Sequence, residues 1–537
     1  MRYTKLLAIV AVPVTIAAAM FQVSHAQGAS ARTIVEGAAK ALGGVEQIQA
    51  VKNVTLHGYA QYAYQMGGGR ITGSPDAPEK YMAANDLTRV YDLANGRFQM
   101  RERRNMVFPF LAPFGHSFAL NDNRLDGDVA FDVNGDRAQR VPQFTDNPLT
   151  LDGVHMRRMW MMNNPVVLVR AMLDPATKLS APRQVSGVTA VDVILKQGDK
   201  LTAAFTPDHM PAWVRWAHPQ TNLGQATLTT TFTGWSETSG LMMPLAYQTR
   251  LDWRNVDFFK LYVDAYDVDT NIPDLAAPAA VRSAPEPPSY TAQPVTSKPI
   301  GRGVWRISNG TTVIEFKDHV TLFELGVNAR TQAKAVIDHA RMLVPGKPVT
   351  QLIISHHHFD HTAGFREAVA EGLTIIQRPM SGVVFREMAT HAAPEFPDDL
   401  AKNPKPLKFM AVDEHLQLKD EAQTVDVYWG RNNGHMADVV FAYVPSEKLV
   451  IEGDMVTAAF DWQHWPDTFR DAIAYYKLDV QKISPVHSVW REHPDVLTYE
   501  QAEELLKGGT ERARQHCAEE LAKGNYFPGC PIQSKYY

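Results

Sequence analysis

The chain has 537 residues, more than one ordinary core organises, and this favours two domains. Hydrophobic residues make up 45% of it and charged residues 21%, a balance typical of soluble globular proteins. The formal net charge of −5 provides no positive field that would attract a phosphate backbone, so nucleic acid is not an expected partner. We expect a small-molecule substrate instead.

The first residues have the layout of a secretory signal. Arg2 and Lys5 precede an apolar stretch at 6–20, and Ser24-His25-Ala26 offers the small residues that a signal peptidase reads. A membrane anchor is the alternative, but this stretch contains a proline and is shorter than the ~20 residues that cross a bilayer. We expect cleavage near Ala26 and a periplasmic or secreted protein without an integral membrane segment.

Alternation of apolar and polar residues dominates the chain up to residue 271. After a short helical stretch at 31–51, it predicts an antiparallel β-rich domain. The clearest alternating segments are 54–64, 191–196, 201–205, 226–235 and 260–267. Gln197-Gly198-Asp199, between two of them, predicts a hairpin turn.

The segment 155–162 is rich in methionine, a side chain that fills irregular apolar space. We expect a core helix there. The alternative is a flexible apolar surface that contacts substrate or lipid.

Residues 272–299 are rich in Pro and Ala, which predicts a semi-rigid linker. Beyond it, expected strands alternate with expected helices, as in an α/β layered domain. The expected organisation is a signal peptide at 1–26, a β-rich domain at 27–271, the linker at 272–299 and a second domain at 300–537.

Cys517 and Cys530 are the only cysteines. In an exported protein they can form a disulfide, which would stabilise the fold by about 3 kcal/mol, although two free thiols are the alternative. Neither is close in sequence to the histidine-rich segment, so a thiolate metal ligand is not expected.

Metal-binding side-chain types cluster after the buried strand expected at 349–354. His356, His358, Asp360 and His361 occupy four of six consecutive positions. The first two are two residues apart and point the same way in an extended segment, whereas the last two diverge where the chain turns into a helix. Such crowding is costly unless a divalent cation compensates it, so the pattern predicts a metal site with room for two ions.

These four residues match the signature His-x-His-x-Asp-His, and with it the chain resembles the metallo-β-lactamase fold superfamily. Gly434-His435, Gly453-Asp454 and His487 follow in the family's order. The resemblance spans most of 301–487. It implies an αββα sandwich, so the expected fold class is α/β (α+β), with this sandwich preceded by the antiparallel β-rich domain.

Residue by residue, the resemblance assigns His356, His358 and His435 to a first metal, Asp360, His361 and His487 to a second, and Asp454 to a bridge between them. A bridging carboxylate offsets the repulsion of two dications about 3.5–4 Å apart. The true β-lactamases of the superfamily usually lack this Asp. Its presence shifts the expected activity towards esters, lactones, thioesters and related bonds, as in the glyoxalase II and lactonase-type branch.

The resemblance therefore implies a metal-dependent hydrolase with two divalent ions, zinc by expectation and iron or manganese as alternatives. A water held between two zinc ions has its pKa lowered towards ~7, and Asp360 is expected to orient it as the nucleophile. Three other functions stay open. They are a mononuclear iron thiol or persulfide dioxygenase, a β-lactamase, and an envelope lipid-binding protein, the last because the β-rich segment faintly resembles lipoprotein-carrier half-barrels.

Three further predictions concern the surroundings of the site. The segment 459–466 is expected at its mouth, with Phe460, Trp462, His464 and Trp465 as candidate substrate contacts, although packing against the N-terminal domain is the alternative. Many relatives carry an Asp where this chain has Glu324, so either Glu324 supports the metal ligands at longer reach or that support is absent. His357 is expected to be structural.

Overall fold

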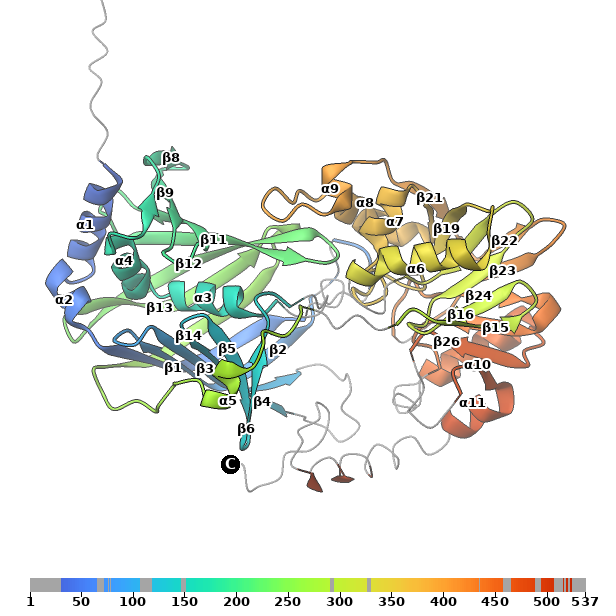
Figure 1. Ribbon diagram of the computed structural model, residues 1–537, viewed down its shortest axis with the longest axis horizontal. Coiled ribbons are helices and arrows are strands. Elements are labelled where there is room, and N and C mark those ends of the chain that lie inside the picture. Colours follow the sequence, from blue (N-terminus) through green and yellow to red (C-terminus); the bar gives the residue numbers. More distant parts are fainter. Residues whose placement is uncertain are drawn as a thin grey trace, which may run out of the picture.

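The computed structural model describes residues 30–64, 72–75, 77, 79–106, 118–145, 151–289, 294–325, 330–433, 435–456, 465–487, 494–506, 515, 518–519 and 522–523. Figure 1 shows two domains side by side, a β-rich one from the N-terminal half of the chain and an α/β one from the C-terminal half. The segment expected to be a signal peptide lies outside the described residues, as do both cysteines.

The N-terminal domain, called the β-domain below, is built on one 14-stranded sheet. Its strands are β1 (Asn53–Ala63), β2 (Tyr81–Asp92), β3 (Arg97–Met106), β4 (Phe118–Asp126), β5 (Val129–Asn134), β6 (Arg137–Val141), β7 (Lys178–Leu179), β8 (Arg183–Val185), β9 (Val188–Ile194), β10 (Lys200–Phe205), β11 (Pro211–Gln220), β12 (Gly224–Thr238), β13 (Leu241–Leu251) and β14 (Asp257–Val268). They lie in the order β6-β5-β4-β3-β2-β1-β14-β13-β12-β11-β10-β9-β7, with β8 on β9. Every pairing is antiparallel, which confirms the predicted β-rich domain.

Helices pack against one face of this sheet. They are α1 (Ala31–Ala41), α2 (Val45–Ala50), α3 (Val154–Met162) and α4 (Pro165–Leu173), with a short 3₁₀ helix η1 (Trp253–Asn255) after β13. The helix expected at 31–51 is thus interrupted, at Gly43 and Gly44, both of which have positive φ. The methionine-rich segment is α3, and all its residues are buried, so the predicted core helix is confirmed.

Helix α4 begins with two sequence signals that the structure uses. Asn164 is its N-cap, and its side-chain oxygen accepts a hydrogen bond from the backbone N–H of Val166 at 3.0 Å. Pro165 follows at the first helical position, where its missing N–H costs nothing. Between β14 and the next strand lies α5 (Ala279–Ser283), whose Val281 packs on Phe131 of β5.

The C-terminal domain contains two further sheets. The first, in the order β15-β16-β17-β18-β19-β20-β21, has the strands β15 (Ser297–Gly301), β16 (Val304–Ile307), β17 (Thr312–Glu315), β18 (Val320–Phe323), β19 (Val349–Ile353), β20 (Thr374–Gln377) and β21 (Lys408–Ala411). The second, in the order β22-β23-β24-β25-β26-β27, has β22 (His415–Lys419), β23 (Thr424–Trp429), β24 (Val440–Val444), β25 (Leu449–Glu452), β26 (Lys482–Pro485) and β27 (Leu497–Thr498).

The two sheets pack face to face through side chains such as Phe323 and Ile353 of the first and Val427 and Ile451 of the second. Helices cover the outer faces (Figure 1). They are α6 (Arg330–Leu343), α7 (Phe365–Glu371), α8 (Gly382–Thr390) and α9 (Asp399–Lys402) on one side and α10 (Trp465–Tyr476) and α11 (Tyr499–Leu506) on the other, with 3₁₀ turns η2 (Pro379–Ser381) and η3 (Pro445–Glu447). The predicted αββα sandwich is confirmed.

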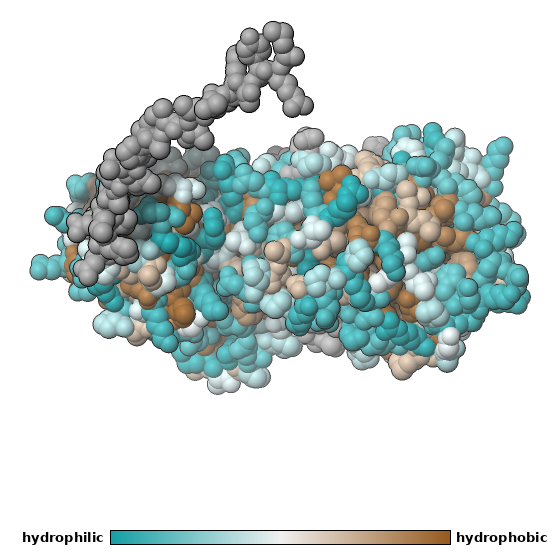
Figure 2. Space-filling view, turned by 90° about the horizontal axis from the view of Figure 1, so that it is seen from above, coloured by the Kyte–Doolittle hydropathy of each residue, from teal (hydrophilic) through white to brown (hydrophobic). Residues whose placement is uncertain are grey.

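The outer surface is largely polar. Figure 2 shows a face on which hydrophilic side chains predominate and apolar ones gather in small groups. Within the part of the chain that the structure describes, no helix has the length and apolar character needed to cross a membrane.

Candidate metal centre

Seven side chains converge from strand ends of the C-terminal domain. The metal loop, residues 355–362, follows β19 and carries four of them. The other three follow neighbouring strands: His435 lies between β23 and β24, Asp454 follows β25 and His487 follows β26. Because these strand ends meet at one edge of the sandwich, residues more than a hundred positions apart become neighbours.

The first donor set, His356, His358 and His435, is compact and buried. The Nε2 atom of His356 lies 2.9 Å from Nδ1 of His358 and 3.2 Å from Nε2 of His435. Three imidazole nitrogens therefore face one point, which is the donor type and arrangement that zinc and similar ions take.

The second donor set, Asp360, His361 and His487, lies beside the first and is less enclosed. Nε2 of His361 is 3.2 Å from Nε2 of His487, and Oδ2 of Asp360 is 3.3 Å from that same His487 nitrogen. The His487 side chain is 34% exposed, whereas the His361 side chain is fully buried. The second set thus borders the route by which a substrate can reach the centre.

Asp454 contacts both sets. One carboxylate oxygen, Oδ2, lies 3.1 Å from Nε2 of His435, and the other, Oδ1, lies 3.2 Å from Nε2 of His487. Its backbone has φ of 61°, a left-handed conformation that a non-glycine residue adopts only where its surroundings hold it. The preceding Gly453 is required by close approach, since a Cβ there would lie 2.3 Å from Oγ of Ser355.

Several polar atoms at this point are buried without a hydrogen-bond partner among the described residues: Nε2 of His358, Oδ1 of Asp360 and Oδ1 of Asp454. Orphaned buried donors and acceptors are costly and call for an explanation. A cation beside Asp454, with a water or substrate group next to it, would satisfy the two carboxylate oxygens, whereas Nε2 of His358 lies on the side of its ring away from the donor point. The residues present therefore fit a metal site, and Asp454 stands where a bridging ligand would be.

The charge balance of the centre supports the same conclusion. Burial and the neighbouring imidazoles hold the pKa of His356 and of His358 well below the ordinary value, so both rings are neutral, the form that binds a cation. Burial also acts on Asp454, but the nearby His487 and His361 outweigh it and keep the pKa of this carboxyl well below its usual range. The bridge is therefore anionic.

The comparison with protein families agrees with this geometry. Residues 308–482 match the family described as the metallo-beta-lactamase superfamily. This part of the chain is a metallo-β-lactamase superfamily domain. The matched region contains every donor named above except His487, which lies five residues beyond its end.

Similar solved structures include a metallo-beta-lactamase from Pontibacter korlensis, at 16% identity over 40% of this chain and 99% of that chain, with a TM-score of 0.30. Others are the metallo-beta-lactamase from Hirschia baltica, at 17% identity over 41% and 98% with a TM-score of 0.30, and the DIM-1 metallo-beta-lactamase, at 16% identity over 41% and 98% with the same score. No curated protein is significantly similar to this chain.

Glu324 supports the metal loop of the metallo-β-lactamase domain. Its Oε1 accepts a hydrogen bond from the backbone N–H of Ser355 at 2.6 Å, and its Oε2 lies 3.4 Å from Nδ1 of His361. It is fully buried and has φ of 63°, so its position is tightly determined. Of the two alternatives left by the sequence, the structure shows that the carboxylate support is present.

A second support for the metal loop was not foreseen from the sequence. Asp438 accepts hydrogen bonds from the backbone N–H of His357 at 3.1 Å and from its ring Nδ1 at 2.8 Å. Gln377 donates to the backbone oxygens of Ser355 and Asp438. His357 is therefore structural, as predicted.

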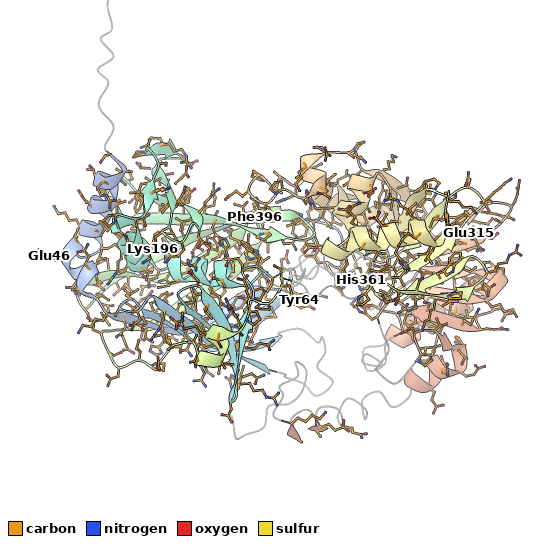
Figure 3. The ribbon with its side chains drawn as sticks, in the orientation of Figure 1. Glu46, Tyr64, Lys196, Glu315, His361 and Phe396 are labelled. Atoms are coloured by element: carbon orange, nitrogen blue, oxygen red, sulfur yellow. The ribbon has the colours of Figure 1, made fainter. Side chains whose placement is uncertain are left out.

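The β-domain also reaches the centre. Tyr64 follows β1 and Lys80 precedes β2, and the backbone N–H of Tyr64 donates to the oxygen of Lys80 at 2.8 Å. Burial and then the charges of Asp360 and Asp454 raise the pKa of Tyr64. Figure 3 shows Tyr64 and His361 on the facing sides of the two domains. No local sequence pattern marks Tyr64 or Lys80.

The predicted substrate contacts at 459–466 stay predictions. Phe460, Trp462 and His464 lie outside the described residues. Trp465 is the first residue of α10, and its side chain is likewise not described.

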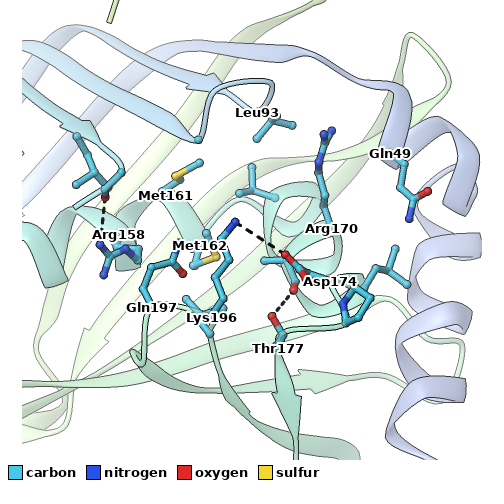
Figure 4. A pocket seen from close by; sticks show the side chains of 18 residues that line it. Gln49, Leu93, Arg158, Met161, Met162, Arg170, Asp174, Thr177, Lys196 and Gln197 are labelled. Carbon is cyan, nitrogen blue, oxygen red and sulfur yellow. Dashed lines mark hydrogen bonds and ion pairs between the residues drawn. The ribbon is translucent and has the colours of Figure 1, made fainter. Parts of the chain in front are cut away.

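A pocket of about 340 Å³ lies elsewhere, inside the β-domain (Figure 4). Met161 and Met162 of α3 line it together with Leu93 and Arg170. The methionine-rich helix is thus buried in the core and also borders a cavity. None of the metal-centre residues lines this pocket.

Proposed function

We propose that this protein is an exported, dinuclear metal-dependent hydrolase that acts on an ester, lactone, thioester or related bond. The observation that carries the proposal is the contact of Asp454 with both donor sets, 3.1 Å to His435 and 3.2 Å to His487. A carboxylate in that place has a clear use when it bridges two cations, and the superfamily to which the domain belongs is largely hydrolytic. Zinc is the proposed metal because histidine and carboxylate donors predominate.

When bound, such ions would supply a water of lowered pKa and a Lewis acid for negative charge that develops on the substrate. The protein's own groups have the complementary tasks. The unpartnered, buried Oδ1 of Asp360 can accept a proton from a nucleophilic water and so orient it. Glu324 and Asp438 hold the metal loop in place, which keeps the donors organised before substrate arrives.

Tyr64 and Lys80 give the β-domain a part in the same reaction. The raised pKa of Tyr64 keeps its phenol protonated at neutral pH, so its hydroxyl can donate a hydrogen bond to a substrate oxygen. The charge of Lys80 lies close enough to contribute to the low pKa of His358 and of His435. These two residues are the proposed wall of the substrate site opposite the metals.

The decisive experiment is metal quantification on purified mature protein, combined with a panel of lactone, thioester, arylester, phosphodiester and β-lactam substrates. Two zinc ions per chain with turnover of an ester-like substrate is the expected result. One iron per chain with oxygen consumption in the presence of a thiol or persulfide would instead show a dioxygenase. Turnover of the β-lactam alone would show a β-lactamase.

His361→Ala is the control that ties activity to the second donor set. It removes one ligand without touching the first set, so activity should vanish while the domain still folds. Retained activity with a single ion would contradict the dinuclear proposal.

Export is proposed on the signal-like N-terminus. Expression of the full chain in a Gram-negative host, followed by fractionation and N-terminal sequencing, tests it. A mature start near residue 27 in the periplasm or medium supports export, whereas an intact Met1 in the cytoplasm contradicts it.

A further inference from the structure

The tip of one β-domain hairpin is buried against the back of the metal loop. Residues 221–223 join β11 to β12, and Asn222 lies at this tip with no exposed surface. Asparagine at a hairpin tip ordinarily faces water, where its amide is readily hydrated. A fully buried amide instead indicates specific partners.

The partners of Asn222 belong to the other domain. Its Nδ2 donates one hydrogen bond to the backbone oxygen of Phe359 and another to Oγ1 of Thr362, both at 2.8 Å. Both amide hydrogens are therefore used. The two acceptors flank Asp360 and His361, which are two of the three residues in the second donor set.

The amide is itself held in one orientation. Its own oxygen accepts from Nε2 of Gln220 at 3.3 Å, and Gln220 in turn accepts from the backbone N–H of Leu223 at 2.7 Å. On the other side, Oγ1 of Thr362 donates to the backbone oxygen of His358 at 2.9 Å. A continuous chain of hydrogen bonds thus runs from the hairpin tip into the metal loop.

The close approach is built into the hairpin. Gly224 has φ of 77°, and a Cβ at this position would lie 3.0 Å from Cβ of Ala393 and 3.1 Å from Nη2 of Arg366, so a side chain here would be strained and would require its neighbours in the other domain to shift. Nearby, the ring of Trp253 packs on the ring of Phe359 with centroids 5.5 Å apart. Phe359 is therefore contacted by the β-domain through both its backbone and its side chain.

The first donor set is held mainly by its own domain, and the hydrogen-bond chain from Asn222 reaches it only at the backbone oxygen of His358, through Thr362. Oγ of Ser355 hydrogen-bonds with Nδ1 of His356 at 2.9 Å, and the backbone N–H of His435 donates to Oδ1 of Asn433 at 2.8 Å. Both supporting residues belong to the metallo-β-lactamase domain. The two halves of the centre therefore depend on the β-domain to different degrees, and the second set, flanked by both acceptors of Asn222, depends on it more.

We propose that Asn222 is a positioning residue for the second donor set, so that the β-domain completes the half of the metal centre formed by Asp360, His361 and His487. This inference rests on the proposed dinuclear site. It predicts that the two metal-binding steps respond differently to a change made in the other domain.

The test is titration of the metal-free full-length protein with Co²⁺ alone, followed by calorimetry and by the visible spectrum of the bound ion. Asn222→Ala removes both donors, and Asn222→Asp keeps the shape but replaces the donating amide by a carboxylate, which cannot donate when ionised. We expect the second binding step to weaken by about ten- to hundredfold in both variants, with the first step unchanged. Thr362→Ser, which keeps the hydroxyl, should bind like the wild type.

Gln225→Ala is the matched control. Its Oε1 accepts from the backbone N–H groups of Glu395 and Phe396 at 2.9 and 3.2 Å, so it also bridges the two domains, but away from the metal loop. Figure 3 shows Phe396 on the side of its domain that faces the β-domain. We expect this variant to leave both binding steps within about twofold of the wild type, below the effect expected for a ligand-supporting partner.

Three results would overturn the inference. They are a wild-type protein that binds a single ion, an equal loss in both steps for the Asn222 variants, and a Gln225 variant that reproduces their effect. The outcome is separate from that of the proposed activity, because a selective loss of the second step stands even if no substrate in the panel is hydrolysed.

Discussion

In the β-domain, the buried guanidinium of Arg157 donates to the carboxylates of Asp152 and Asp132, and that of Arg158 pairs with Asp199. In the metallo-β-lactamase domain, by contrast, buried imidazoles face one another around an anionic bridge, and one imidazole nitrogen and several carboxylate oxygens of the centre have no hydrogen-bond partner among the described residues. Buried charge that the chain itself neutralises indicates structure. Buried polar atoms that it leaves open indicate a ligand.

Arg89 is an instructive intermediate case. It is fully buried in the β-domain, and none of its three guanidinium nitrogens has a hydrogen-bond partner among the described residues. Its cation instead lies over the rings of Trp160 and Phe259, at 5.1 and 4.8 Å from their centroids. Aromatic faces attract a desolvated cation, so the β-domain compensates even this charge internally.

The variant Asp454→Ala has the largest expected effect and tests whether the polar groups of the metal centre indicate a ligand. Because the variant lacks the anion between the donor sets, we expect the second metal to be lost and hydrolysis to fall by about a thousandfold or more. Metal content and turnover measure this. If activity survives with two ions bound, the carboxylate between the donor sets did not indicate a ligand.

The counterpart in the β-domain is Asp199→Ala. This change leaves the buried Arg158 and His155 without their shared carboxylate, so we expect the β-domain to lose about 4 kcal/mol of stability. Metal binding should be unchanged. Urea unfolding and metal analysis of the same sample separate the two effects. A loss of metal without a loss of stability would contradict the structural role of Asp199.

We expect acid to lower the stability of the β-domain because the buried His218 becomes protonated when the domain unfolds. Burial, and next the neighbouring His155, lower the pKa of His218 to about 4 from the ordinary 6.5. The unfolded chain takes up a proton below pH 6.5, whereas the folded chain does so only near pH 4. Neutral His218 therefore makes its full contribution to the free energy of unfolding above pH 6.5. This contribution is lost as the pH falls towards 4, by up to about 3 kcal/mol.

Urea unfolding at several pH values between about 7.5 and 4.5, for the wild type and His218→Gln, checks this expectation. The variant has no titrating group at the position, so its stability should fall less steeply on acidification. Parallel curves would mean that His218 is not neutral in the folded state.

The smallest expected effect concerns Glu324. In Glu324→Gln the acceptor for the Ser355 N–H can persist but the negative charge near His361 is removed, so we expect metal affinity to fall by about ten- to hundredfold. Competition with a chelator measures this. An unchanged affinity would show that Glu324 serves the backbone of the loop alone.

The donor residues could be predicted from the sequence because the first four form a local motif and the other three follow in the order of the family that the chain resembles. The spacing of His356, His358, Asp360 and His361 is local, and His435, Asp454 and His487 each come soon after a strand or in a strand-connecting loop, where sandwich loops gather at one edge. Asn222 could not be predicted in this way. It lies 137 residues from Phe359, and only the packing of the two domains brings them together.

The fold was predicted unevenly for a related reason. Strands such as β9 and β12 alternate clearly, whereas β3 and β4 are rich in charged and amide side chains that obscure the apolar period. In the structure these side chains satisfy one another across the sheet, as Gln99 does with Asp122 at 2.8 Å and Asn123 with Asp132 at 2.7 Å. Such cross-strand pairs stabilise a sheet but leave no periodic signal in the sequence.

The pairing of β1 with β14 has a consequence for how the chain is made. These strands are neighbours in the sheet although the register joins Val54 to Val268, so most of the β-domain must be synthesised before its first strand gains its second partner. Pairing over so long a separation is slow, and until it forms, β1 and β14 each present an open edge. A truncated chain that stops before residue 257 is accordingly expected to aggregate rather than to yield half a domain.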